Sequence, residues 1–233
     1  MVPVTTFRER LRDLPVFPED LPGWEVADLD ALPATPHELF VAWFDDAVDA
    51  GLLAPHAATL STTDAAGRVH ARTLICKEVT DDGWWFAGHA DSPKGRDLES
   101  NPHAALTFFW RELGRQVRVS GPVTPDAEAG AADFRARPDA SRAAGLVGRQ
   151  SEPLGSLAEH RAAWADALER VRAEPALVAP TWTAWVLAPT EVEFWATGTG
   201  TGQTRVRYRT DLAASLEAGD RTPAPWTKEL LWP

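Results

Sequence analysis

The stretch HAALTFFWRELGRQVRVSG, residues 103–121, places two runs rich in Val, Thr, Phe and Trp on either side of a turn at Glu112–Gly114. β-Branched and aromatic runs joined by a short turn predict two antiparallel strands. On the amino-terminal side, similar runs reach back to His56 and are separated by turn residues at 64–67 and 81–83. We therefore expect residues 56–121 to form an antiparallel meander of about four strands.

Helical patterns surround this predicted meander. Thr35 begins a helix, because Pro36 and Glu38 follow it as in a capping box. A short helix interrupts the meander, and further helices follow it, at 92–102, 125–136 and 157–173. Strand patterns return at 181–188, 191–197, 204–209 and 226–232. Because strands and helices do not alternate regularly, we expect a mainly β fold of the α+β type, an antiparallel barrel with flanking helices.

The composition describes one acidic domain. The 233 residues carry a formal net charge of -11, which argues against a nucleic-acid binder because phosphate contacts need clustered Lys and Arg. No apolar run approaches the roughly 18 to 20 residues that cross a bilayer, and the start of the chain lacks the apolar core of a signal peptide. The single cysteine, Cys76, has no partner for an internal disulfide. We expect a cytoplasmic protein with an irregular arm over 1–34 and one domain over 35–233.

Basic side chains stand at informative positions in this acidic chain. Lys94 follows the helix start at Ser92 closely, so backbone N–H groups, the positive end of the helix dipole and an ammonium converge. This pattern predicts a phosphate site, although Ser-Pro-Lys also occurs on ordinary exposed helices. Arg72 and Lys77 flank an apolar strand, and their spacing places them on opposite faces if the strand is regular. Both can reach one ligand only through a bulge or across two subunits.

Several other chemistries lack their sequence signals. The glycines of residues 198–202 lie between two predicted strands and open no helix, so they predict a hairpin and not a dinucleotide-binding loop. The six histidines lack the spacing of a zinc site, and the chain has no serine-hydrolase elbow. We therefore expect no metal.

Taken together, these pieces resemble the pyridoxamine 5'-phosphate oxidase family over about residues 36–233. The resemblance rests on an ordered set of segments: Arg72–Lys77, Ser92–Lys94, Asn101-Pro102, Trp110–Val117, Arg137-Pro138, Arg149–Ser151, Val192–Trp195 and Trp226–Pro233. It implies an FMN-binding split β-barrel, a homodimer with two FMN sites at its interface, and a C-terminal dimerisation region over 181–233. The implied activity is oxidation of a C–N or C–O bond with O2 as the final acceptor.

The resemblance implies an FMN site whose residue types are well kept. The implied FMN contacts are Arg72, Lys77, Ser92, Lys94, Gln116, Gln150, Ser151, Trp195 and Arg205. Arg and Lys neutralise the phosphate and favour negative charge on the reduced ring, while Gln amides can pair with the polar edge of the isoalloxazine. Two departures stand nearby: Ala87-Gly88 replaces an aromatic followed by Thr or Ser, and Pro93 replaces a frequent Arg.

The implied substrate side departs further from the family. Lys77, Arg137 and Ser141 match positions that hold the phosphate or ring of a pyridoxal-type substrate. However, Asp133 stands where a phosphate-binding Tyr is usual. A carboxylate about 4 Å from a phosphate is unfavourable by roughly 4 kcal/mol per charge pair at an effective dielectric near 20.

The same resemblance, aligned without gaps, places Thr201 and Gln203 at the Arg and His of a substrate-covering Arg-x-His-x-Arg motif. These two are the candidate catalytic positions, and their change favours an altered substrate. The leading hypothesis is oxidation of pyridoxamine or pyridoxine 5'-phosphate to pyridoxal 5'-phosphate and H2O2. One alternative is an FMN-dependent oxidase of a different small metabolite, as in the phenazine pathway. Another is a non-catalytic flavin-binding protein, or a barrel that binds deazaflavin.

Overall fold

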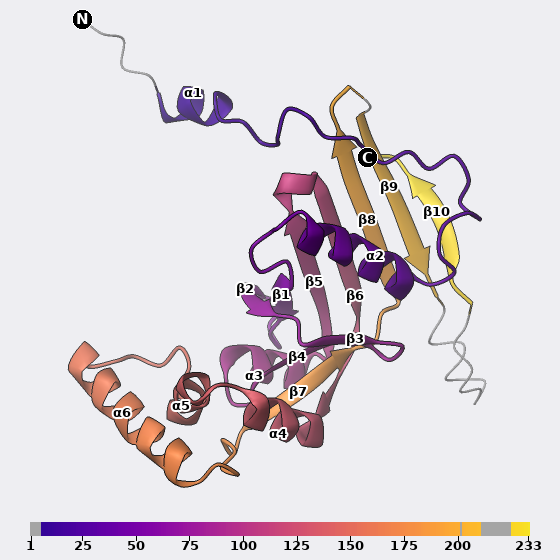
Figure 1. Ribbon diagram of the computed structural model, residues 1–233. Coiled ribbons are helices and arrows are strands. Elements are labelled where there is room, and N and C mark those ends of the chain that lie inside the picture. Colours follow the sequence, from indigo (N-terminus) through magenta and orange to yellow (C-terminus); the bar gives the residue numbers. More distant parts are fainter. Residues whose placement is uncertain (1–5, 201, 211–224) are drawn as a thin grey trace, which may run out of the picture.

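The computed structural model describes residues 6–200, 202–210 and 225–233 (Figure 1). Its strands are β1 (Ala57–Thr63), β2 (Val69–Ile75), β3 (Glu78–Thr80), β4 (Gly83–His89), β5 (His103–Trp110), β6 (Arg115–Asp126), β7 (Trp182–Leu187), β8 (Glu191–Gly198), β9 (Gly202–Arg209) and β10 (Thr227–Leu231). The predicted meander is confirmed as antiparallel, but it holds six strands and not about four. The count was wrong in part because β3 has only three residues and is joined to β4 by a tight turn.

All strand pairs of the described chain are antiparallel, as expected. The main path runs β10-β9-β8-β6-β5-β1-β2, while β7 and β4 branch from β6 and carry β3. The glycine-rich segment at 198–202 joins β8 to β9, so the predicted hairpin is confirmed. The strands form a curled sheet with two arms, in agreement with the split barrel expected from the sequence.

Strand β6 joins the two arms of the sheet. Its first half pairs with β5 and β8, and residues 123–126 pair with β7. The change of partner falls at Gly121, where an added Cβ would collide with the carbonyl oxygen of Ala188. Only a residue without a side chain allows this close approach of two backbones.

The helices are α1 (Phe7–Arg12), α2 (Pro36–Asp49), α3 (Pro93–Ser100), α4 (Ala127–Ala136), α5 (Asp139–Val147) and α6 (Leu157–Ala173). Thr35 accepts a hydrogen bond from the backbone N–H of Glu38, which confirms the predicted capping box. The helix predicted from residue 125 begins at 127, because β6 continues to Asp126. Helix α5 was not predicted from the sequence.

The core lies between α2 and the sheet. Helix α2 lies across β5, β6 and β8 in Figure 1 and buries Leu39, Phe40, Trp43 and Ala47. Phe40 packs against Phe108 of β5 with ring centroids 4.8 Å apart, and Trp43 packs against Phe194 of β8 at 5.2 Å. Aromatic pairs at these distances add to the stability that buried area alone provides.

The residues before α2 run along the surface of the molecule (Figure 1). Apart from α1, residues 6–34 form no helix, and Pro22 makes an isolated bridge to Gly198 at the β8–β9 hairpin. Leu21 is buried beside Gly114, and this segment contacts the sheet at several further points.

The described residues contain no helix long and apolar enough to cross a membrane. In the same part of the chain, no group of three or more His, Cys, Asp or Glu side chains is arranged to hold a metal ion.

Candidate functional site

Four of the predicted FMN contacts come together at the start of α3. Ser92 is the N-cap of this helix, and its hydroxyl accepts a hydrogen bond from the ammonium of Lys94 at 2.9 Å. The same ammonium donates to the side-chain oxygen of Gln150 at 3.1 Å. We call Arg72, Ser92, Lys94 and Gln150 the Lys94 cluster. It unites β2, α3 and the loop after α5.

Lys94 is deeply buried for a charged residue, with 7% of its surface exposed. Burial, and then the positive charge of Arg72, lower the pKa of Lys94 to about 8. Gly88 leaves space for this side chain, because an added Cβ at that position would lie 2.7 Å from Cε of Lys94. The glycine that departs from the family pattern therefore lies directly against the buried lysine.

Arg72 is held by an acidic group that the sequence did not single out. Its guanidinium donates to the hydroxyl of Thr62 at 2.6 Å and lies 3.6 Å from the carboxylate of Asp97. Asp97 also accepts hydrogen bonds from Thr62 at 2.6 Å and from His70 at 3.0 Å. Burial alone would raise the pKa of Asp97, but these hydrogen bonds lower it. Asp97 therefore keeps a negative charge that fixes the position of Arg72.

Three other predicted FMN contacts form a row across neighbouring strands. Gln116 of β6 lies opposite Trp195 of β8, and Trp195 lies opposite Arg205 of β9. Residues directly opposite in antiparallel strands point to the same face of the sheet. Gln203 accepts a hydrogen bond from the indole N–H of Trp195 at 3.2 Å. We call Gln116, Trp195, Gln203 and Arg205 the Trp195 row; Thr201, the other candidate catalytic position, lies outside the described residues.

The Trp195 row includes an ion pair, and an aromatic side chain of the amino-terminal segment packs against it. Arg205 makes an ion pair with Glu193 at 2.9 Å. Phe17, from the amino-terminal segment, packs against Trp195 with ring centroids 5.9 Å apart and against Phe109 at 6.3 Å. Phe109 is 51% exposed, so part of this face of the sheet remains open to a ligand or a second chain.

The Lys94 cluster and the Trp195 row lie in different parts of the molecule. The first surrounds α3 and the loop after α5, and the second lies on β8 and β9 near their hairpin (Figure 1). Within the part of the chain that the structure describes, no hydrogen bond or ion pair joins the two groups. One copy of the chain therefore does not bring all the predicted FMN contacts together.

The predicted substrate residues form a third group, centred on Trp182. Lys77 lies 3.3 Å from the carboxylate of Asp133, which also accepts a hydrogen bond from the indole N–H of Trp182 at 3.0 Å. The guanidinium of Arg137 stacks over Trp182, 4.3 Å from the ring centroid. We call Lys77, Asp133, Arg137 and Trp182 the Trp182 cluster. Ser141 lies in the first turn of α5 and is half-buried.

A bend in the chain determines where Lys77 points. Strand β2 ends at Ile75, and the backbone N–H of Lys77 already donates to Trp85 of β4 at 2.7 Å. Arg72 therefore belongs to one arm of the sheet and Lys77 to the other. The irregularity that the spacing of these two residues required is present in the structure.

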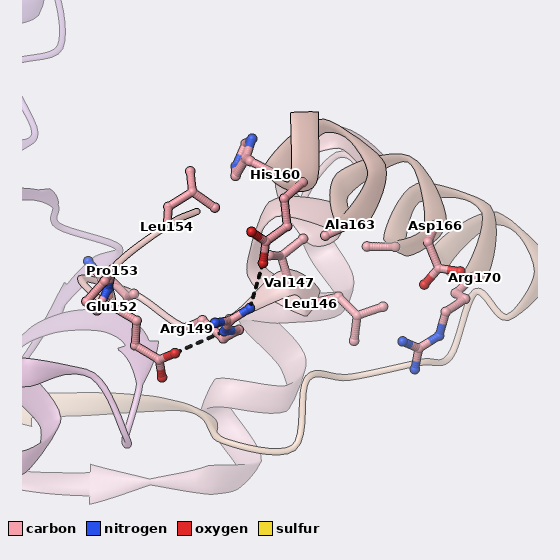
Figure 2. Close-up of a pocket in the computed structure, with 14 residues that line it drawn as sticks. Leu146, Val147, Arg149, Glu152, Pro153, Leu154, His160, Ala163, Asp166 and Arg170 are labelled. Atoms are coloured by element: carbon pink, nitrogen blue, oxygen red, sulfur yellow. Dashed lines mark hydrogen bonds and ion pairs between the residues drawn. The ribbon is translucent and has the colours of Figure 1, made fainter. Parts of the chain in front are cut away.

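Gln150 also lines a pocket of about 440 Å³ between α5, α6 and the loop that joins them (Figure 2). Arg149 crosses this pocket, with ion pairs to Glu152 at 2.9 Å and to Glu159 of α6 at 3.4 Å. Arg149 and Ser151 have left-handed backbone conformations, which are uncommon for residues other than glycine. The ion pairs hold the loop to α6 and so fix Gln150 toward Lys94, while Ser151 is exposed.

Two family models together match residues 44–233 of the chain. The model described as pyridoxamine 5'-phosphate oxidase matches residues 44–196. A second model, described as the pyridoxine 5'-phosphate oxidase C-terminal dimerisation region, matches residues 182–233.

Curated relatives and solved structures agree with these matches. Pyridoxine/pyridoxamine 5'-phosphate oxidase of Nitrobacter hamburgensis is 38% identical over 204 residues, covering 85% of this chain and 89% of the relative. The protein with the same name from Salinibacter ruber is 39% identical over 204 residues, with coverage of 85% and 89%. The structure of PhzG from Burkholderia lata 383 with tetrahydrophenazine-1-carboxylic acid superposes with a TM-score of 0.79 at 28% identity, covering 90% of this chain and 98% of PhzG.

Proposed function

This chain belongs to the pyridoxamine 5'-phosphate oxidase family, and from that membership we propose that it is an FMN-dependent oxidase of a small anionic molecule. The bond oxidised is a C–N or C–O bond of that molecule, and O2 is the final acceptor. The relatives named above are oxidases, which supports the reaction class. The proposal rests on the geometry of the Lys94 cluster.

The Lys94 cluster has the properties of a site for the FMN phosphate. Lys94 is buried at the N-terminus of α3, and its hydrogen bonds go to neutral oxygen atoms of Ser92 and Gln150. The charge of Arg72 disfavours the charged form of Lys94. A phosphate placed between these cations and the first N–H groups of α3 would remove that repulsion. The residues present therefore fit the phosphate of FMN.

The Trp195 row has the residue types that suit the flavin ring. Gln116 can donate to and accept from the polar edge of an isoalloxazine, and Arg205 favours negative charge on it. Because this row lies away from the Lys94 cluster, we propose that each FMN is bound between the Lys94 cluster of one subunit and the Trp195 row of another. The match to a dimerisation region over residues 182–233 supports a homodimer with two such sites.

Held by the Lys94 cluster and the Trp195 row, FMN would supply the two-electron chemistry between the substrate and O2. The chain's own residues bind and orient the substrate. Arg137 is the cation available for the anionic group of the substrate. Its guanidinium stacks on Trp182, 4.3 Å from the ring centroid. Gln203 holds the indole of Trp195 through a hydrogen bond at 3.2 Å. Fixed orientation of a substrate beside its acceptor supplies a large part of the rate of such reactions.

The proposal is tested by loading the purified protein with FMN and measuring H2O2 release in the presence of O2. Pyridoxamine 5'-phosphate and pyridoxine 5'-phosphate are the first substrates, because the relatives carry their names. Partly reduced ring compounds that carry a carboxylate, such as tetrahydrophenazine-1-carboxylic acid, are the second set, because of the similarity to PhzG. We expect bound FMN and H2O2 release with at least one set.

Two outcomes would contradict the proposal at different levels. A protein that binds no FMN has no flavin chemistry, and the whole proposal would be wrong. A protein that binds FMN but whose photoreduced flavin is not reoxidised by O2 would be a flavin-binding protein without oxidase activity. Lys94→Met is the matched control for adventitious flavin, since it should lose the bound FMN.

A further inference from the structure

The Trp182 cluster contains an ion pair within the region proposed to bind the substrate. Lys77 and Asp133 lie 3.3 Å apart, with 34% and 17% of their side-chain surfaces exposed. Charges this close and this shielded attract each other strongly compared with charges in open water. The positive charge of Lys77 is therefore already paired with a carboxylate before any ligand binds.

Asp133 is held in place by more than its attraction to Lys77. Its second oxygen accepts a hydrogen bond from the indole of Trp182 at 3.0 Å. Trp182 in turn packs against Phe134 and His89, with ring centroids 5.4 and 5.0 Å apart. A carboxylate with two donors does not move away from the cluster without leaving one of them unsatisfied.

Arg137 is the opposite case within the same cluster. Its guanidinium stacks on Trp182 and has no hydrogen-bond or ion-pair partner among residues 6–200, 202–210 and 225–233, and its Nη1 atom is buried without a partner. Burial lowers the pKa of the nearby His89, so His89 adds no full positive charge at neutral pH. The cluster therefore offers a substrate one free cation, and that cation has the planar fork that pairs with a carboxylate.

Resting on the proposed function, we infer that Asp133 determines specificity and that the substrate carries a single negative charge, as an aromatic carboxylate, in place of a phosphate dianion. A carboxylate needs only Arg137 for a two-hydrogen-bond pairing. A phosphate dianion would meet the free cation Arg137 and also Lys77, which is already paired with Asp133. The carboxylate of Asp133 would repel the dianion. Asp133 thus excludes phosphate esters while keeping a site for a weaker anion.

The test compares two kinds of anion bound to the FMN-loaded protein, followed by the change in flavin absorbance. The phosphate probe is 4-deoxypyridoxine 5'-phosphate, which has no oxidisable carbon at position 4. The carboxylate probes are 4-pyridoxic acid, which has a similar ring, and phenazine-1-carboxylic acid. We expect the wild-type protein to bind at least one carboxylate ten or more times more tightly than the phosphate. This comparison requires no variant.

The variant Asp133→Asn removes the charge but keeps an oxygen for the indole of Trp182. We expect its affinity for the phosphate probe to rise about tenfold, with a much smaller change for the carboxylates. Glu128→Gln, an equal change of charge at an exposed position on the same helix, should leave both affinities unchanged.

A wild-type protein that binds the phosphate probe at least as tightly as both carboxylates would overturn the inference, and so would an Asp133→Asn variant with unchanged phosphate affinity. In both cases bound FMN would still support the proposed oxidase. Loss of FMN binding in the wild type would instead contradict the proposed function itself.

Discussion

The Lys94 cluster and the Trp182 cluster both bring two basic side chains together, but they balance the charges differently. In the first, Asp97 fixes Arg72, and Lys94 is hydrogen-bonded to neutral oxygen atoms. In the second, Asp133 pairs with Lys77, and the guanidinium of Arg137 stacks on Trp182 and makes no hydrogen bond or ion pair within the described residues. Each cluster therefore leaves one cation for a ligand. In the Lys94 cluster that cation lies at a helix N-terminus that suits phosphate, whereas in the Trp182 cluster a carboxylate lies nearby and disfavours phosphate.

Two sites proposed on one fold can therefore balance their charges differently. The residues of the proposed flavin site leave a buried ammonium at a helix N-terminus, while those of the proposed substrate site include an acid that alters the charge available to a ligand. In this way, proteins that bind the same cofactor can accept different substrates.

The largest expected effect separates the clusters by cofactor affinity. Lys94→Met removes the buried ammonium, and we expect FMN affinity to fall about 100-fold, since a hydrogen bond from a charged group contributes about 1.5 to 3 kcal/mol. Fluorescence titration with FMN measures this change. Arg111→Gln, at an exposed arginine, is the control and should bind FMN normally. A Lys94→Met protein with wild-type FMN affinity would remove Lys94 from the phosphate site.

The second prediction addresses the other cluster. Arg137→Met should raise the KM for the substrate about 30-fold, because the free cation of the Trp182 cluster is lost. FMN affinity should stay within about twofold, since Arg137 is not part of the Lys94 cluster. Steady-state kinetics and FMN titration are measured on the same sample, with Arg135→Met on the same helix as the control. Equal losses of FMN and substrate binding would show that the clusters are not separate.

A third, smaller effect follows from the pKa of Lys94, which burial and Arg72 lower to about 8. The free protein loses the Lys94 proton as the pH rises through this value, and FMN phosphate binds the charged form. We therefore expect FMN affinity to fall by about 25-fold between pH 7.5 and 9.5. The Lys94→Met variant, titrated in the same buffers, should lack this decrease. An identical pH profile in both proteins would assign the decrease to another group.

The smallest effect concerns the Trp195 row. Gln203→Ala removes the acceptor for the indole of Trp195, and one neutral hydrogen bond contributes about 1 kcal/mol. We expect kcat to fall about threefold while KM changes less, because orientation and not binding is affected. A loss of 100-fold or more would show that Gln203 acts on the substrate directly.

Much of the architecture could be predicted from local sequence signals. Thr35 and Glu38 predicted the start of α2, the predicted boundaries of α6 were correct, and the glycines near residue 200 predicted the β8–β9 hairpin. These features depend on neighbouring residues in the chain. Helix α5 and the short strand β3 carry no such signal, and their formation depends on packing against other elements.

The candidate site was predicted residue by residue, but its pairings were not. The sequence placed Asp133 beside an expected phosphate, whereas the structure pairs it with Lys77 and Trp182. Asp97 was missed as the partner of Arg72, because no sequence feature distinguishes it from other acids of the chain. Such pairs join residues far apart in sequence, and only the curled sheet brings them together.

The most direct test of the account is complementation between two variants that damage opposite halves of the flavin site. Lys94→Met and Arg205→Met, each expected to bind FMN weakly, are refolded together so that subunits mix. If each site is shared between subunits, half of the dimers are hybrids with one intact site, and the mixture should regain about one quarter of the wild-type FMN sites. A mixture that binds no more FMN than its two components would show that both halves of the site belong to one chain, and the shared-site account would be wrong.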